Sequence, residues 1–203
     1  MAVAARKRAG AARAQATREK VVAAAGRLFV ERGYLDTTMA ELAAVAGVAV
    51  QTLYLSFGSK AAVLKSVWAD GGPDHPSGWL EALRAARDGP AALAWHVAMT
   101  TAAVERRHPL DAVLRAAAAD PEPAALLAVA RESALDVHTR AVDELAERPG
   151  FTVDMSLQRA TDVLATLLAP ETYGLLVVEQ AWTTPDWAEW ALRHLLLDLF
   201  PPS

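Results

Sequence analysis

Apolar residues recur every three or four positions along most of this chain, which is the spacing of one face of an α-helix. In the segment TREKVVAAAGRLFVERGY, residues 17–34, the positions Val21, Val22, Ala25 and Leu28 follow this spacing, and charged residues lie between them. Strand-type alternation of β-branched and aromatic residues is hard to find anywhere in the chain. The pattern predicts an all-α protein.

Helix start and stop signals follow this first segment. Gly33 is expected to cap its C-terminal end, and Thr38 with Glu41 has the Thr-x-x-Glu spacing of a capping box that opens a second helix. The second helix is short and is expected to stop at Gly47, and a third helix begins after a turn of about three residues. Two helices joined in this way form a helix-turn-helix.

The third predicted helix, in the segment GVAVQTLYLSF of residues 47–57, is small and nearly uncharged. Helical spacing places Leu53 and Phe57, with Val50 one turn earlier, toward the first two helices. The same spacing points the side chains of Gln51, Thr52 and Leu55 away from those helices. A face meant only for water usually carries Lys or Glu, so their absence suggests that a partner approaches closely.

The rest of the chain is also predicted to be helical. The expected helices cover residues 77–89, 90–108, 109–120, 121–148, 154–169, 170–181 and 185–200. Pro109, Pro123, Pro170 and Pro185 suit first-turn positions, and Thr184 suits the N-cap of the last helix.

The last predicted helix carries apolar residues over too wide a surface for one core-facing stripe. We expect a second copy of the chain to cover the remainder, with this helix and residues 167–178 forming a four-helix dimer interface. The residues expected there are Leu168, Tyr173, Leu176, Trp187, Trp190, Ala191, His194 and Leu195. The alternative is a helix fully buried within a monomer.

The distribution of charge separates the beginning of the chain from the rest. The first 60 of the 203 residues hold nine Lys or Arg and four Asp or Glu, whereas the remainder holds eleven and twenty. A basic first third favours contact with a polyanion, although a solvated helix surface is the plainer alternative. The chain has no Cys, which excludes disulfides, thiolate metal sites and thiol nucleophiles.

Residues 1–14 lead with basic residues into further basic residues, which does not fit a secretory signal. Arg6, Lys7, Arg8 and Arg13 are expected to form a flexible basic arm that could lie along the backbone or in the minor groove of a nucleic acid, and a disordered solubilising tail is an equal alternative. The longest uncharged stretch, residues 42–59, contains Gly47, Gln51 and Gly58 and is interpreted as helices joined by a turn. A cytoplasmic protein without a membrane partner is expected.

Residues 26–68, GRLFVERGYLDTTMAELAAVAGVAVQTLYLSFGSKAAVLKSVW, resemble the DNA-binding region of the TetR family of bacterial transcriptional regulators. The matching features are LF-x-E-x-GY, the paired threonines, the AGV turn, TLY, and a Ser-Lys pair before a fourth helix. The resemblance implies a helix-turn-helix DNA-binding domain over residues 15–60 and a helical ligand-binding and dimerisation domain over 61–203. It implies a homodimeric repressor that leaves its double-stranded DNA operator when a small apolar or aromatic effector binds.

The same resemblance places the third helix in the major groove, where base edges differ in their donors, acceptors and methyl groups. Val50, Gln51 and Thr52 are the expected base contacts. Thr38, Tyr54 and Lys60 correspond to family contacts with phosphates. Two departures weaken the pattern: Ala49 stands where the family often has a capping Ser, and Leu55 with Ser56 replaces an aromatic or His pair.

An effector pocket is implied among the middle helices. Its expected residues are Trp79, Leu83, Trp95, His96, Met99, Leu114 and His138. Each of them, taken singly, is better explained as part of the hydrophobic core.

Two other classes of protein compete with this interpretation. Glu105 and His108 form a Glu-x-x-His pair of the kind found in di-iron bundles, but such sites need a second pair and further carboxylates. We expect no catalytic residue, no metal and no cofactor. The remaining alternative is a ligand-sensing or protein-interaction module of the same fold that has lost specific DNA binding.

Overall fold

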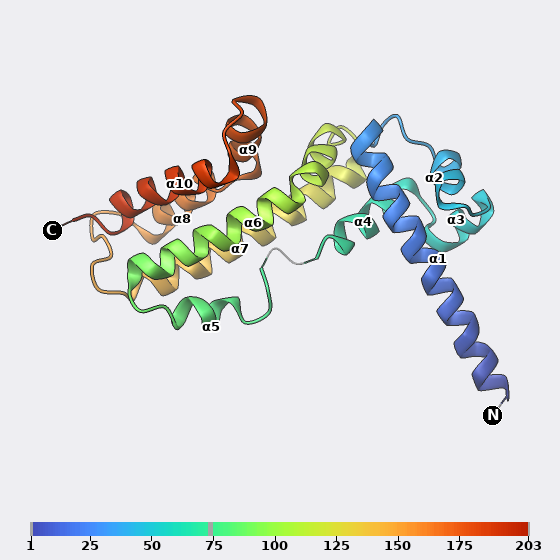
Figure 1. The fold of residues 1–203 in the computed structure, drawn as a ribbon, viewed down its shortest axis with the longest axis horizontal. Coiled ribbons are helices and arrows are strands. Elements are labelled where there is room, and N and C mark those ends of the chain that lie inside the picture. The colour runs from blue at the N-terminus through green and yellow to red at the C-terminus, as the bar shows by residue number, and fades with distance from the viewer. Residues whose placement is uncertain (1, 73–74, 203) are drawn as a thin grey trace. The chain divides into compact units, whose positions relative to one another are not determined.

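The computed structural model describes residues 2–72 and 75–202, and every regular element in that part of the chain is a helix (Figure 1). The contacts divide the chain into two compact units. The first unit comprises residues 1–72 and 109–127, and the second comprises residues 73–108 and 128–203. The all-α prediction is confirmed.

The first unit is built around the long helix α1 (Ala2–Arg32), which packs against two other helices. These are α2 (Met39–Ala46) and α4 (Lys60–Asp70), and α3 (Val50–Phe57) packs against both of them. The core is apolar and draws on all four helices and on residues 113–127. Its fully or almost fully buried members include Val21, Ala25, Phe29, Leu42, Leu53, Val63, Leu64 and Leu114.

The predicted end signals of α1 and α2 are confirmed. Thr38 caps α2, its hydroxyl accepting from the Glu41 amide, while the Glu41 carboxylate accepts from the Thr38 amide. Gly33 follows α1 with its amide bonded to the Phe29 carbonyl, and Gly47 follows α2 at φ +67°. Only glycine adopts such a left-handed backbone at no steric cost, which explains why α2 ends there.

The expected arm over residues 1–14 is not a separate segment, because α1 begins at Ala2. Alanine and arginine are among the best helix formers, so this stretch extends the helix that follows it. Met1 and the side chains of Arg6, Lys7 and Arg8 lie outside the described residues.

The expected domain boundary at residue 60 also differs from the division observed. Helix α4 packs on α1 and buries Val63, Leu64 and Val67 in the core of the first unit. Residues 109–127 join the same unit through Leu114 and its neighbours. Two stretches far apart in the sequence therefore form one body.

The second unit begins with α5 (Trp79–Arg84) and takes most of α6 (Gly89–Ala116) and α7 (Pro121–Ala146). It continues with α8 (Leu157–Leu167), α9 (Pro170–Tyr173), a π-helical stretch η1 (Gly174–Glu179) and α10 (Thr184–Leu199). Helix α10 packs along α8 and η1. The core includes Leu83, Leu93, Val142, Leu145, Leu164, Trp187 and Leu195.

Two of the expected helix ends are wrong. Residues 90–120 were expected to form two helices, but α6 passes through Pro109. An interior proline costs roughly 3 kcal/mol, and the helix is buried on both sides of it, through Val104 in one core and Val113 in the other. The N-cap of α10 is Thr183, one residue before the expected Thr184, because its hydroxyl pairs with Asp186 in a capping box.

Candidate nucleic-acid interface and ligand site

Helix α3 presents an exposed and uncharged surface. Leu53 is its one fully buried residue and fixes the helix to the core, whereas Gln51, Thr52 and Ser56 are exposed. Leu55 is 82% exposed, an unusual state for a leucine. Val50 is 39% exposed, so the expectation that it faces the first two helices is wrong. A ligand of α3 would therefore meet amide, hydroxyl and aliphatic groups without a charge among them.

The N-terminus of α3 lacks a side-chain cap, as the sequence predicts. Ala49 has the extended backbone of an N-cap residue, φ −69° and ψ 142°, but offers no hydrogen-bonding side chain to the first turn. A missing cap of this kind costs about 1 kcal/mol of helix stability. Burial of Leu53 and contacts at the other end of the helix must hold α3 in place.

Arg18 of α1 supplies those contacts at the C-terminal end of α3. One guanidinium nitrogen, Nη1, donates to the Ser56 carbonyl at 3.1 Å, and Nη2 donates to the Ser66 hydroxyl at 2.8 Å. The guanidinium also lies 4.3 Å from the ring centroid of Phe57. Sequence reasoning missed this residue, because its partners lie 38 to 48 positions away and leave no local signal.

The three expected phosphate contacts differ in what their side chains already bind. Tyr54 is half exposed. The Thr38 hydroxyl is exposed but engaged with Glu41, whose carboxylate also contacts Arg32 at 3.0 Å. Hydrogen bonds from Thr38, followed by the charge of Arg32, lower the pKa of Glu41, so this carboxylate stays ionised beside the first turn of α2.

Lys60 is directed into the chain. Its ammonium donates to the carbonyls of Tyr34 at 2.7 Å and Thr37 at 2.9 Å, with the Leu35 carbonyl at 3.4 Å. The expected phosphate contact thus points toward the loop between α1 and α2. The sequence placed Lys60 at the start of a helix correctly, but its partners are 23 to 26 residues away.

The expected ligand-site residues do not all lie in one unit. Leu83, His96 and His138 are buried in the second unit, where Trp79, Trp95 and Met99 are half buried. Leu114 is buried in the core of the first unit instead. Helix α6 passes from one unit to the other at Pro109, so Leu114 belongs to a different unit from the other six residues.

A cluster of histidines marks the interior of the second unit. His96 Nε2 lies 3.1 Å from His138 Nδ1, and the ring of His75 stacks on His96 at 5.6 Å between centroids. His75 also lies within 3.3 Å of the Thr100 hydroxyl and 5.2 Å from the Trp79 ring. Sequence reasoning missed His75, since it lies on an irregular segment with no periodicity.

Burial sets the protonation of this cluster. It lowers the pKa of His138 to about 4, and it lowers the pKa of His96 well below the usual value, with the neighbouring histidines adding to the effect. Both rings are therefore neutral at pH 7. His96 Nδ1 is buried without a hydrogen-bond partner, which leaves one polar atom available to a bound molecule.

The Glu105–His108 pair is used for packing. The Glu105 carboxylate accepts from the Thr184 hydroxyl at 2.7 Å, and the His108 ring lies 4.9 Å from Tyr173. Within residues 2–72 and 75–202, no group of three or more His, Asp or Glu side chains is arranged to hold a metal ion.

Most of the residues expected at a dimer interface are buried within a single chain. Leu168, Tyr173, Trp187, Ala191 and Leu195 belong to the core of the second unit. The reason is that α8, α9 and α10 cover one another: the Trp187 indole donates to the Leu167 carbonyl at 3.2 Å. Leu176, Trp190 and His194 are half buried and remain partly accessible.

Other apolar side chains of α8, η1, α10 and the loop between η1 and α10 are exposed. They are Leu157, Leu175, Val178, Trp182 and Leu197. By length and composition alone, residues Leu157–Glu179 would qualify as a membrane span, as some helices of soluble proteins do; only 22% of the apolar window is buried. The chain by itself therefore leaves much of this apolar stretch uncovered.

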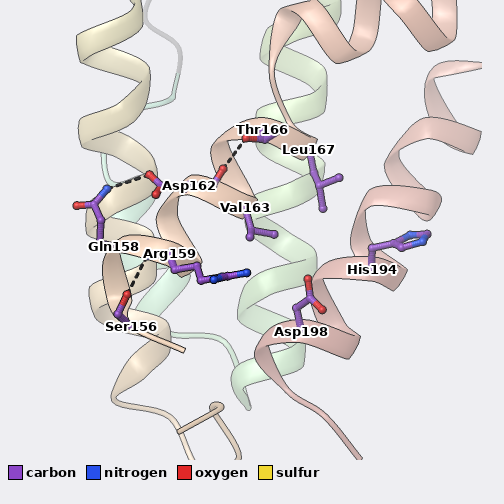
Figure 2. A pocket seen from close by; sticks show the side chains of 9 residues that line it. All are labelled: Ser156, Gln158, Arg159, Asp162, Val163, Thr166, Leu167, His194 and Asp198. Atoms are coloured by element: carbon purple, nitrogen blue, oxygen red, sulfur yellow. Dashed lines mark hydrogen bonds between the residues drawn. The ribbon is translucent and has the colours of Figure 1, made fainter. Parts of the chain in front are cut away.

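A groove of about 680 Å³ runs between α8 and α10 beside these exposed residues (Figure 2). Val163 and Leu167 form its apolar part, and Arg159 and Asp198 carry opposite charges on its two sides. The α8 side is ordered by a hydrogen bond from the Gln158 amide to Asp162 at 2.9 Å. The groove belongs to the surface on which a dimer partner was expected.

Comparison with known proteins agrees with the geometry of the first unit. Residues 21–67 match the family described as bacterial regulatory proteins, tetR family. Two curated relatives, both from Pseudomonas putida, are the probable HTH-type transcriptional regulator ArpR and the HTH-type transcriptional regulator TtgR. Each is 29% identical over 143 residues, which are 70% of this chain and 55% of the relative. The match thus spans about half the length of these relatives.

Solved structures share the fold over nearly the whole chain. NalD, the secondary repressor of the MexAB-OprM multidrug efflux pump in Pseudomonas aeruginosa, superposes with a TM-score of 0.68 at 19% identity, covering 94% of this chain and all of NalD. A SmeT–triclosan complex superposes with a TM-score of 0.71 at 20% identity, covering 91% and 92%.

Proposed function

Because this chain belongs to the TetR family of bacterial regulatory proteins, we propose that it represses transcription as a cytoplasmic homodimer bound to a double-stranded DNA operator. A small apolar or aromatic ligand would release it from that operator. The family consists of transcriptional regulators and not of enzymes.

The observation that carries the proposal is the exposed, uncharged surface of α3. A thin helix without charges can sit deep in the major groove, where Gln51 is able to pair with adenine and Thr52 or Val50 to contact a thymine methyl group. Thr38 and Tyr54 flank this surface as contacts for phosphates, which set the register without reading the sequence.

We assign the two expected functions to the two units. The reading head comprises residues 15–60 together with α4, which shares its core. The second unit, residues 73–108 and 128–203, would bind the ligand and the partner copy. The packing of α4 and of residues 109–127 into the first unit motivates this change from a boundary at residue 60.

A homodimer explains the exposed apolar residues of α8, η1 and α10. Leu175, Val178 and Leu197 would be covered by the same helices of a second copy, and the groove beside them would be filled from that side. A dimer also presents two reading helices to half-sites about 34 Å or a multiple of it apart.

The ligand site is proposed around the histidine cluster. Trp79, Trp95 and Met99 are half-buried apolar side chains of the kind that hold small aromatic molecules. The neutral imidazoles of His96 and His138 would supply hydrogen bonds without a charge. The SmeT structure holds triclosan, which supports an apolar ligand for a domain of this shape.

We would test the proposal by letting the purified protein select DNA duplexes from a pool of random sequences. The expected result is one enriched sequence with two related half-sites and an affinity that falls steeply with salt, log K dropping by about 0.9 per neutralised phosphate and per decade of salt. Enrichment of no sequence, with weak and salt-insensitive binding, would favour the alternative of a sensing or interaction module of the same fold.

A further inference from the structure

The leucine at position 55 lies on the side of α3 farthest from the core. Leu53 is fully buried and Phe57 is half buried against the core of the first unit, so these two residues mark the inner side of the helix. Because an α-helix turns about 100° per residue, Leu55 lies roughly 160° around the helix from both of them. Its exposure of 82% agrees with this position. Leu55 is therefore at the centre of the outward surface of α3.

The two polar residues expected to contact bases lie on either side of Leu55. Gln51 is about 40° to one side of it and Thr52 about 60° to the other, and each comes roughly one turn earlier along the helix. Both are exposed, and no residue of α3 carries a charge. An approach that brings Gln51 and Thr52 to base edges therefore brings Leu55 at least as deep into the major groove.

The chemistry of a leucine side chain restricts what it can recognise there. It has no charge and no hydrogen-bonding group, so it gains little from a phosphate or from a polar base edge. The apolar group that base pairs present in the major groove is the C5-methyl of thymine. Burying one such group against an apolar side chain favours binding by about fourfold, which corresponds to the ~0.8 kcal/mol of a buried methylene.

Leu55 is also more exposed than other large apolar side chains of the first unit. Leu35, in the loop between α1 and α2, is 60% exposed, and Val45, on α2, is 54% exposed. Water surrounds most of the Leu55 side chain in the free protein, so covering it with bound DNA removes more apolar surface from water than covering either of the others.

We propose that Leu55 is a specificity-determining residue that contacts the C5-methyl group of one thymine in each half-site. The inference rests on the proposed operator binding and adds a base contact to it. Leu55 follows Gln51 by about 6 Å along the helix axis, which is the length of roughly two base-pair steps. The thymine is therefore expected within about two base pairs of the base that Gln51 contacts.

Removal of single methyl groups from the DNA tests this contact. In the duplex that the unmodified protein selects, each thymine is replaced in turn by uracil, which lacks only the methyl group, in both half-sites together. At one position we expect affinity to fall by about fourfold per half-site. In Leu55→Ala the same replacement should have almost no effect, because the side chain that covers the methyl group is gone.

Leu35→Ala is the matched control, since it truncates an exposed leucine of the same unit outside α3. It should keep the full loss of affinity on uracil replacement. Contacts of Val50 or Thr52 with other thymines would give losses that persist in Leu55→Ala, so the dependence on Leu55 identifies the position. Helicity and thermal unfolding of Leu55→Ala should match those of Leu35→Ala, because neither side chain is part of a core.

A second arm adds the methyl group back on a different base. With a cytosine–guanine pair at the identified position, 5-methylcytosine should bind the unmodified protein about fourfold more tightly per half-site than cytosine does. Leu55→Ala should bind the two duplexes equally. This arm separates contact with the methyl group from any effect of uracil on the shape of the duplex.

Losses on uracil replacement that are the same in Leu55→Ala and the unmodified protein at every thymine would overturn the inference, because independent effects show no contact. Equal weakening of all duplexes by Leu55→Ala would also overturn it. In both cases a duplex has been selected, so the proposed function stands while the reading role of Leu55 fails. If the unmodified protein selects no duplex, the proposed function fails and the role of Leu55 fails with it.

Discussion

The imidazoles of His96 and His138 lie edge to face inside the second unit, with ring centroids 5.3 Å apart and a nitrogen of each ring 3.1 Å from the other. One ring donates and the other accepts across this contact, so a single proton lies between the two rings. Protonating either ring would place a positive charge in an apolar interior, and protonating both would place two such charges next to each other.

This pair predicts that the protein loses stability in mild acid. The folded-state pKa of His138 is lowered to about 4, and that of His96 is lowered well below its usual value, while both titrate near 6.5 when unfolded. Between these pH values the unfolded chain binds more protons than the folded chain. The contribution of the two neutral rings to folding stability is therefore fully present above about pH 6.5 and is lost as the pH drops toward 4. For His138 the loss is on the order of 3 kcal/mol.

Urea unfolding at pH 7.5, 6 and 5 measures this effect. His138→Asn removes one titrating group and should give a flatter dependence, even if its stability at pH 7.5 is lower. An unchanged dependence in the variant would show that other groups cause the acid sensitivity.

Replacing Gln51 by Ala is expected to relax base preference at one position of each half-site. A bidentate amide contact discriminates between bases by about 1–3 kcal/mol, so the preferred duplex should lose most of its advantage over single-base variants while non-specific affinity stays the same. Competition binding with a panel of such duplexes measures this. Ser56→Ala, also exposed on α3, is the control; equal weakening of every duplex by Gln51→Ala would contradict a reading role.

Ala49→Ser is expected to stabilise the first unit by about 1 kcal/mol through the missing cap of α3. The backbone at Ala49 already has N-cap geometry, so no rearrangement is required. Thermal unfolding measures the gain. Ala44→Ser, on the exposed side of α2, places the same residue inside a helix and should stabilise nothing; equal effects of the two changes would argue against capping.

Charged substitutions on the exposed apolar residues are expected to separate a dimer without unfolding the chain. Leu197→Glu and Val178→Glu should shift sedimentation toward the monomer and leave helicity intact, because both side chains are exposed in the single chain. Val153→Glu, at an even more exposed position in a loop, is the control.

Leu195→Ala is expected to destabilise the folded chain instead of separating the dimer. Its side chain is fully buried, so truncation is expected to cost about 2–5 kcal/mol of folding stability through a cavity. Loss of the dimer on Leu195→Ala at full stability would restore the original expectation that this residue meets the partner.

Interactions within about four residues were determined by the sequence alone. The Thr38–Glu41 capping box, the end of α2 at Gly47 and the uncapped Ala49 all depend on neighbours in the chain, and each was predicted as it is observed. The all-α fold and the outward face around Gln51 also followed from residue spacing, because helical periodicity is itself local.

The tertiary structure alone decided which side chains reach one another across distant segments. Lys60 was placed correctly at a helix start, but its carbonyl partners depend on how α1 packs against α4. Leu114 and Leu195 are both apolar residues at helical spacing. No local pattern shows which of the two cores Leu114 joins, or whether Leu195 packs inside the chain or against a partner. Burial depends on which helices cover a position, and that is a property of packing between segments far apart in the chain.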